Sequence, residues 1–150
     1  MKIKPSDIVG LFARVLVGGV LVYAGFLKAA GPSAEFAAAL AAYKLFPPFL
    51  ITPLSTLVPY VEMWVGLFVF TGFYTRYSSL AAAVLFTIFL SVLGSALLRG
   101  IDLASCGCFG ADMLSPHRTL AMDTVLFVLS LTTHKLNRYP TRWSLDQALL

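Results

Sequence analysis

The sequence predicts an all-α membrane protein, a four-transmembrane-helix bundle with a short interfacial helix between the first and second spans. Of the 150 residues, 59% are hydrophobic and 12% are charged, whereas soluble domains have about 25% charged residues. The apolar residues also gather in runs of about 20, the length that crosses a hydrocarbon core of about 30 Å. Four such spans and their loops would fill residues 1–150 as a single transmembrane domain.

The first predicted span covers residues 8–27 and contains one charge, Arg14. Gly18 and Gly25 lie seven residues apart, on one face of this helix, where small residues let a neighbouring helix approach closely. The basic N-terminus is typical of a signal peptide, but Lys28 stands where small residues would be needed for cleavage. We therefore expect this span to be retained.

A short helix is expected at residues 33–44, after the break at Gly31-Pro32. Ser33 is its expected N-cap, and Pro47-Pro48 closes the segment that follows it. The segment is too short to cross a bilayer and is expected to lie at the membrane surface.

The second and third predicted spans cover residues 54–73 and 77–98. Glu62 is the only charged residue of the second span, and the third span contains none. Both runs have the length and the apolar composition of a transmembrane helix.

The fourth predicted span covers residues 116–133, after a loop at residues 99–115 that contains both cysteines. Ser115 is a suitable N-cap and Pro116 a suitable first helical residue, because proline needs no hydrogen bond at that position. The sequence thus predicts a polar, cysteine-containing loop between the last two spans.

Four spans place both termini on the same side of the membrane. The positive-inside rule makes that side the cytoplasm, because it holds six basic residues against four on the other side. The cysteine loop would then be periplasmic, across a bacterial inner membrane. Because the basic residues are scattered rather than gathered on one face, nucleic acid is not an expected partner, and the lipid bilayer is. The six are Lys2, Lys4, Arg76, Lys135, Arg138 and Arg142, and the four are Lys28, Lys44, Arg99 and Arg118.

Cys106-Gly107-Cys108-Phe109-Gly110 is the most specific local motif. Two thiols one residue apart can close a small disulfide, and Gly107 permits the bend that this requires. A strained, exposed disulfide is suited to exchange, so Cys106 and Cys108 are the candidate catalytic residues. Two other interpretations remain open: an inert structural bridge, or a Cu(I) or Zn site that adds Met113 and His117.

Charges within the predicted spans form a second group of candidate residues, because each is costly in hydrocarbon unless it is paired. Helix rise predicts a contact between Arg14 and Glu62, and Lys28 is a candidate partner for Asp123. In a functional alternative, Glu62 and Asp123 relay protons or line a quinone or substrate pocket beneath the cysteine loop. His134, at the end of the last span, is assigned no chemistry.

Several motifs together suggest a family, and they extend from about residue 8 to residue 133. They are Arg14 with Gly18, Tyr23 to Lys28, Tyr43 to Pro48, Glu62 with Gly66, Ser95 to Gly100, and Cys106 to Gly110.

With these motifs the chain resembles the DoxX-like membrane proteins, and among them the MauE type of methylamine utilisation. The resemblance implies a four-helix bundle in the bacterial inner membrane that is associated with thiol and disulfide chemistry. It also implies a partner, either a thioredoxin-like periplasmic protein or a disulfide-containing client such as the small subunit of methylamine dehydrogenase. Quinone-coupled enzymes of the DsbB and vitamin K epoxide reductase type have a similar general shape. Unlike those enzymes, this chain has no C-x-x-C motif and no second cysteine pair.

Overall fold

The computed structural model describes residues 5–101 and 115–136, and all of their regular structure is helical. This confirms the predicted all-α class. The helices are α1 (Pro5–Ala30), α2 (Ser33–Ala42), α3 (Pro48–Thr71), α4 (Thr75–Leu98) and α5 (Pro116–Leu136).

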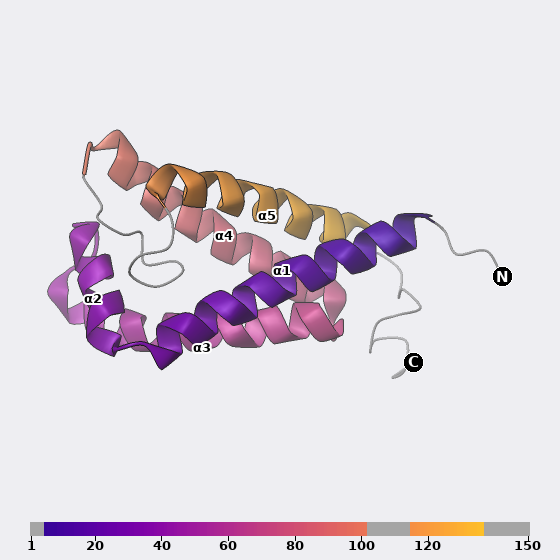
Figure 1. The fold of residues 1–150 in the computed structure, drawn as a ribbon, viewed down its shortest axis with the longest axis horizontal. Helices are drawn as coiled ribbons and strands as arrows, with labels where there is room; N and C mark the ends of the chain where they lie inside the picture. The colour runs from indigo at the N-terminus through magenta and orange to yellow at the C-terminus, as the bar shows by residue number, and fades with distance from the viewer. Residues whose placement is uncertain (1–4, 102–114, 137–150) are drawn as a thin grey trace.

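The four long helices form an elongated bundle, and the short helix α2 lies across one end of it (Figure 1). The most extensive packing joins α1 to α3 and α4 to α5, and fewer contacts join α3 to α4. The bundle therefore consists of two tightly packed helix pairs, and α2 packs mainly against α3.

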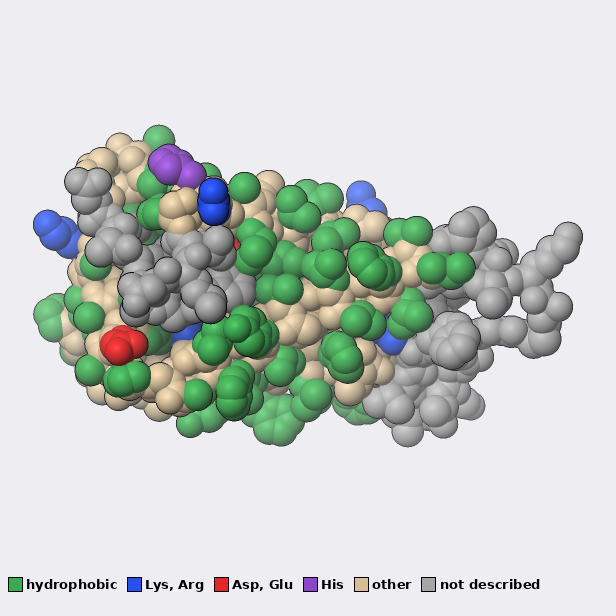
Figure 2. Space-filling model, in the orientation of Figure 1, with side chains coloured by type: hydrophobic (Ala, Val, Ile, Leu, Met, Phe, Trp, Pro, Cys, Tyr) green, Lys and Arg blue, Asp and Glu red, His purple; other side chains and the backbone are tan. Residues whose placement is uncertain are grey.

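Among the described residues, three helical segments are long and apolar enough to cross a membrane: Ile8–Ala30, Pro48–Thr71 and Thr75–Leu98. The segment predicted as the fourth span corresponds to α5, which has sufficient length but is less apolar. Its buried polar residues include Thr119, Asp123 and Ser130. Hydrophobic side chains cover much of the face shown in Figure 2, as expected of a protein in a lipid bilayer.

The starts of α2 and α3 differ from the predictions, and each of these helices has a proline as its N-cap. The N-cap of α2 is Pro32, so Ser33 is the first helical residue and makes no side-chain capping bond. Helix α3 begins at Pro48, six residues before the predicted start of the second span, with Pro47 in an extended conformation as its N-cap. Proline fits the first helical position because its fixed φ suits the helix and it has no N–H to leave unpaired.

Glycines bring α1 and α3 into close backbone contact, as the spacing of Gly18 and Gly25 predicted. A Cβ atom added to Gly18 would lie 2.6 Å from the backbone nitrogen of Phe70, and one added to Gly25 would lie 2.6 Å from the carbonyl oxygen of Pro59. From the other side, a Cβ on Gly66 would lie 2.8 Å from the backbone nitrogen of Val22. Side chains at these glycines would force the two helices apart.

Two hydrophobic clusters fill the interior. The larger joins α1, α3, α4 and α5 through the buried side chains Val17, Leu21, Val69, Ala82, Phe86 and Leu126. The smaller lies towards α2 and consists of Tyr43, Leu93 and Ala96, with Ile101 and Leu120 packed against it.

Candidate functional site

A buried ion pair joins α1 to α3 near the α2 end of the bundle. The Lys28 ammonium lies 2.5 Å from Oε1 and 2.6 Å from Oε2 of Glu62, so it donates to both carboxylate oxygens. The side chains are 3% and 0% exposed, respectively. Removing either partner from such a pair would leave a buried charge without compensation, a cost of about 3–5 kcal/mol.

The close approach of α1 and α3 positions this pair. Gly25 lies one turn before Lys28 on α1, against the Pro59 carbonyl and the Met63 side chain of α3. Pro59 and Met63 flank Glu62 in the sequence, so the glycine contact holds the two charged side chains at the same level of the bundle. A side chain at position 25 would separate the backbones where the pair forms.

The predicted contact between Arg14 and Glu62 is wrong. Because Gly25 lies opposite Pro59 and Met63, Glu62 is level with a point on α1 about eleven residues from Arg14. At 1.5 Å per residue this separation is roughly 16 Å, beyond the reach of an arginine side chain. The prediction failed because it took the ends of the two spans as level. Pro59, which lies opposite Gly25, is eleven residues into α3, whereas Gly25 is only five residues before the end of α1, so the first turns of α3 extend beyond α1.

The suggested partner of Lys28 also needs correction, because Lys28 pairs with Glu62 and not with Asp123. Arg14 and Asp123 are each 3% exposed, and neither lacks an interaction partner. The side chains of Arg14, Lys28, Glu62 and Asp123 are all buried.

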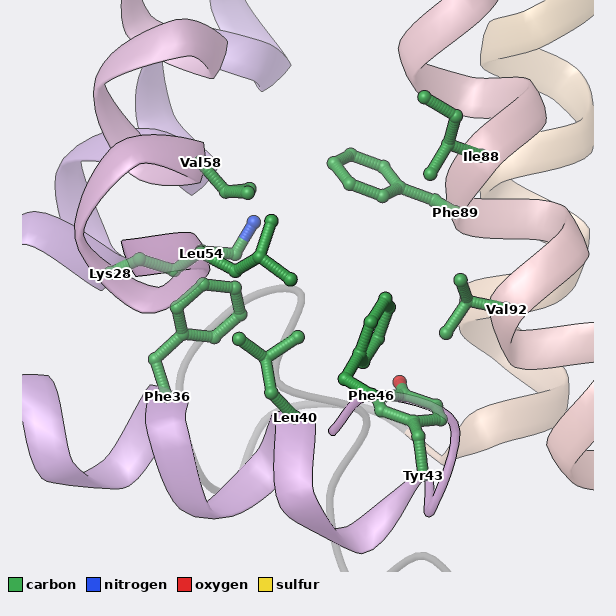
Figure 3. Close-up of a pocket in the computed structure, with 10 residues that line it drawn as sticks. All are labelled: Lys28, Phe36, Leu40, Tyr43, Phe46, Leu54, Val58, Ile88, Phe89 and Val92. Carbon is green, nitrogen blue, oxygen red and sulfur yellow. The ribbon is translucent and has the colours of Figure 1, made fainter. Parts of the chain in front are cut away.

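Beside the ion pair is a pocket of about 120 Å³ between α2, α3 and α4 (Figure 3). We call it the Lys28 pocket. It is lined by Lys28, Phe36, Leu40, Tyr43, Phe46, Leu54, Val58, Ile88, Phe89 and Val92.

Among the described residues that line this pocket, Lys28 is the only charged one, and all the others except Tyr43 are apolar. Its Nζ lies 5.5 Å from the centre of the Phe36 ring and 5.3 Å from that of the Phe89 ring, within the range of cation–π attraction. The functional alternative in the sequence analysis placed Glu62 and Asp123 around a pocket; neither lines this one. Glu62 contributes through Lys28, because its carboxylate binds the ammonium that faces the pocket.

Arg99 closes the α2 end of the bundle. Its Nη2 donates to the carbonyl oxygen of Tyr43 at 2.6 Å, and its Nη1 donates to that of Lys44 at 3.5 Å. Lys44 has a φ of 50°, a conformation that few non-glycine residues adopt, in the connection between α2 and α3. The end of α4 is thereby bound to this connection.

The cysteine motif, which consists of Cys106, Gly107, Cys108, Phe109 and Gly110, lies outside the described residues, and so does Met113. His117 is exposed near the start of α5, and the described residues contain no cluster of three metal-ligating side chains. Both the redox and the metal hypotheses for this motif therefore remain predictions. His134, to which no chemistry was assigned, hydrogen-bonds through Nδ1 to the carbonyl oxygen of Arg76 at 2.9 Å.

Sequence reasoning missed the Lys28–Glu62 pair and the pocket. A usable signal was present, because Gly18, Gly25 and Gly66 mark the faces on which α1 and α3 meet. Glu62 lies four residues before Gly66, and Lys28 lies three residues after Gly25. Aligning these glycines in an antiparallel pair brings the two charges to one level.

Comparison with known proteins assigns the chain to a family. The family model described as "Methylamine utilisation protein MauE" matches residues 6–135. The methylamine utilization protein MauE of Methylophilus methylotrophus is 31% identical over 100 residues, which are 67% of this chain and 52% of the relative. The chain thus spans about half the length of this curated relative. No solved structure matches the chain. Since the family model covers most of its length, the chain belongs to the MauE family of membrane proteins.

Proposed function

We propose that this chain serves methylamine utilisation as an inner-membrane thiol–disulfide exchange protein. Its substrate would be a periplasmic thioredoxin-fold partner, or a client protein whose disulfides must form. Family membership supports the metabolic setting, since both the family and its Methylophilus relative are named for methylamine utilisation. The Cys106-Gly107-Cys108 motif supports the chemistry.

The observation that carries the proposal is where the cysteine segment is attached. Ile101, just before it, and Leu120, in the first turns of α5, pack against the same cluster of Tyr43, Leu93 and Ala96. The segment therefore leaves and rejoins the bundle at the α2 end, where the Lys28–Glu62 pair and the pocket also lie. A client bound at that end would meet the cysteine segment.

The exchange requires two thiols and one disulfide. A thiolate of the reduced client attacks the Cys106–Cys108 disulfide, which forms a mixed disulfide and releases the other cysteine of the pair as a thiolate. A second client thiolate then attacks the client sulfur of that mixed disulfide. The client becomes oxidised, and Cys106 and Cys108 are left reduced. The reverse sequence reduces a client disulfide.

The test is to replace each cysteine separately by serine, Cys106→Ser and Cys108→Ser, in the membrane-embedded protein. We expect one variant to accumulate a mixed disulfide with an oxidised client or partner, because its remaining thiolate attacks that disulfide and no second cysteine resolves the product. Both variants should lose turnover while remaining folded. Ser115→Ala, outside the motif, should behave like the parent. A reduction potential between about −120 and −200 mV would agree with exchange, whereas one below about −300 mV, with no trapped client, would indicate a structural bridge.

Metal binding gives a third outcome. Stoichiometric Cu(I) or Zn binding that is lost in either cysteine variant, without any mixed disulfide, would favour the metal site of Cys106, Cys108, Met113 and His117 over exchange.

The proposed topology treats α5 as the fourth span, with both termini cytoplasmic and the cysteine segment periplasmic. Helix α5 packs along α4 and α1, and its 21 residues give a length of about 31 Å. Reporter fusions after Arg99 should be active only in the periplasm, and fusions after Lys135 only in the cytoplasm. Both fusions reporting the same side would contradict the fourth span.

A further inference from the structure

We infer that the Lys28 pocket binds the head ring of a lipid-soluble quinone, whose ring carbonyl accepts a hydrogen bond from the Lys28 ammonium. The inference goes beyond the proposed function and does not depend on it, because it rests on Lys28 and on the apolar side chains around it and requires no thiol. Three properties of the pocket support this ligand class: its size, its polar group and its route to the lipid.

The size of the pocket fits one six-membered ring. An apolar cavity of about 150 Å³ binds benzene in an engineered protein, and this pocket, which is partly open, has a volume of about 120 Å³. Drug-sized ligands need roughly 300 Å³ or more. A flat ring would contact Phe36, Phe46 and Phe89, whose side chains surround the space (Figure 3).

The Lys28 ammonium favours a ligand with a neutral hydrogen-bond acceptor over an anionic ligand. An ammonium has three N–H donors, and Glu62 provides the two acceptor oxygens that bind it at 2.5 and 2.6 Å. A third donor can bind an oxygen placed in the pocket, where Lys28 Nζ projects among apolar side chains (Figure 3). Because the Glu62 carboxylate already neutralises the ammonium, a second anion would bring uncompensated negative charge, and a carbonyl oxygen would not.

One edge of the pocket reaches the surface of the bundle at Ile88. Ile88, which lines the pocket, is 50% exposed on the outer surface of α4. The helix α4 belongs to a segment long and apolar enough to lie within a bilayer, so this surface faces hydrocarbon. A ligand with its ring between α3 and α4 could therefore extend an apolar tail past Ile88 into the membrane.

The experiment compares duroquinone with durene, which has the same tetramethylated ring but no carbonyl oxygens. Binding to the protein in lipid nanodiscs is measured by equilibrium dialysis against empty nanodiscs of the same lipid, which corrects for partitioning. We expect saturable duroquinone binding near one per protein, about tenfold tighter than that of durene, as one charge-assisted hydrogen bond provides. The double variant Lys28→Met with Glu62→Met should bind the two compounds equally.

A matched pair of variants tests the location. Ile88 lines the pocket and Val84 does not, although both lie on α4 one turn apart with similar exposure, 50% and 52%. Ile88→Trp should weaken duroquinone binding about tenfold or more, because the indole blocks the opening, and Val84→Trp should leave it unchanged. The Cys106→Ser and Cys108→Ser double variant should bind like the parent, which separates this inference from the thiol-exchange proposal.

Three results would overturn the inference: no saturable binding, equal binding of durene and duroquinone by the parent, or equal effects of the two tryptophan variants. Equal binding of the two compounds would identify a purely apolar site, such as one for a lipid acyl chain.

Discussion

The middle of the bundle and its α2 end are built from side chains of different size and charge. In the middle, Gly18 and Gly66 let the backbones of α1 and α3 touch, and Ala82 packs into the larger cluster. At the α2 end, aromatic rings such as Phe36 and Phe89 stand between the helices and surround a pocket. Helices approach closely where small residues face each other and are held apart by large ones. The close-packed middle therefore supports an end that retains open space and a buried charge pair.

The largest effect on stability is expected when a charge is removed from the α2 end. Lys28→Met should lower the free energy of unfolding by about 3–5 kcal/mol, because Glu62 would stay buried without its partner. The double variant Lys28→Met with Glu62→Met should regain most of that loss. Denaturant titration in mixed micelles measures both values. A single variant as stable as the parent would mean that the pair does not hold α1 to α3.

A smaller effect is expected from the glycine that joins the two regions. Gly25→Ala would place a methyl group 2.6 Å from the Pro59 carbonyl oxygen, and overpacking of this kind costs about 1–3 kcal/mol. Gly19→Ala on the same helix is the matched control, since a Cβ there has no neighbour within 4 Å. The two variants are compared by the same titration. Both variants gain helix propensity, because alanine favours the helix by up to about 1 kcal/mol over glycine. If Gly25→Ala were as stable as Gly19→Ala, close packing at Gly25 would not hold the two helices together.

The smallest effect is expected at the closure of the α2 end. Arg99→Met removes the hydrogen bonds to the carbonyl oxygens of Tyr43 and Lys44, and should cost about 1–2 kcal/mol. Arg118→Met, at an exposed arginine of α5, is the control and should change stability by less than about 0.5 kcal/mol. Hydrogen exchange of the α2–α3 connection should increase only in the Arg99 variant.

The sequence predicted the elements well and the charge partners poorly. Apolar runs located the long helices, and the spacing of Gly18 and Gly25 located the face of α1 that packs on α3. The partner of a charged residue depends on how far two helices are shifted along each other, and the ends of apolar runs do not show this shift. Each residue of shift moves a side chain by about 1.5 Å. The pocket was unpredictable for a related reason, since its lining comes from four helices and the α2–α3 connection.

The turn between α3 and α4 is short and lies far from the Lys28 pocket. It has only three residues, Gly72, Phe73 and Tyr74, and two of them have left-handed backbone conformations. The Lys28 pocket lies near the other ends of these helices, between Leu54 and Val92. A helix of 24 residues is about 36 Å long, so a rotation of about 5° at the turn would shift the far end by about 3 Å. A small rotation at this turn would therefore widen the mouth of the pocket, and the bonds of Arg99 to the α2–α3 connection would limit how far it opens.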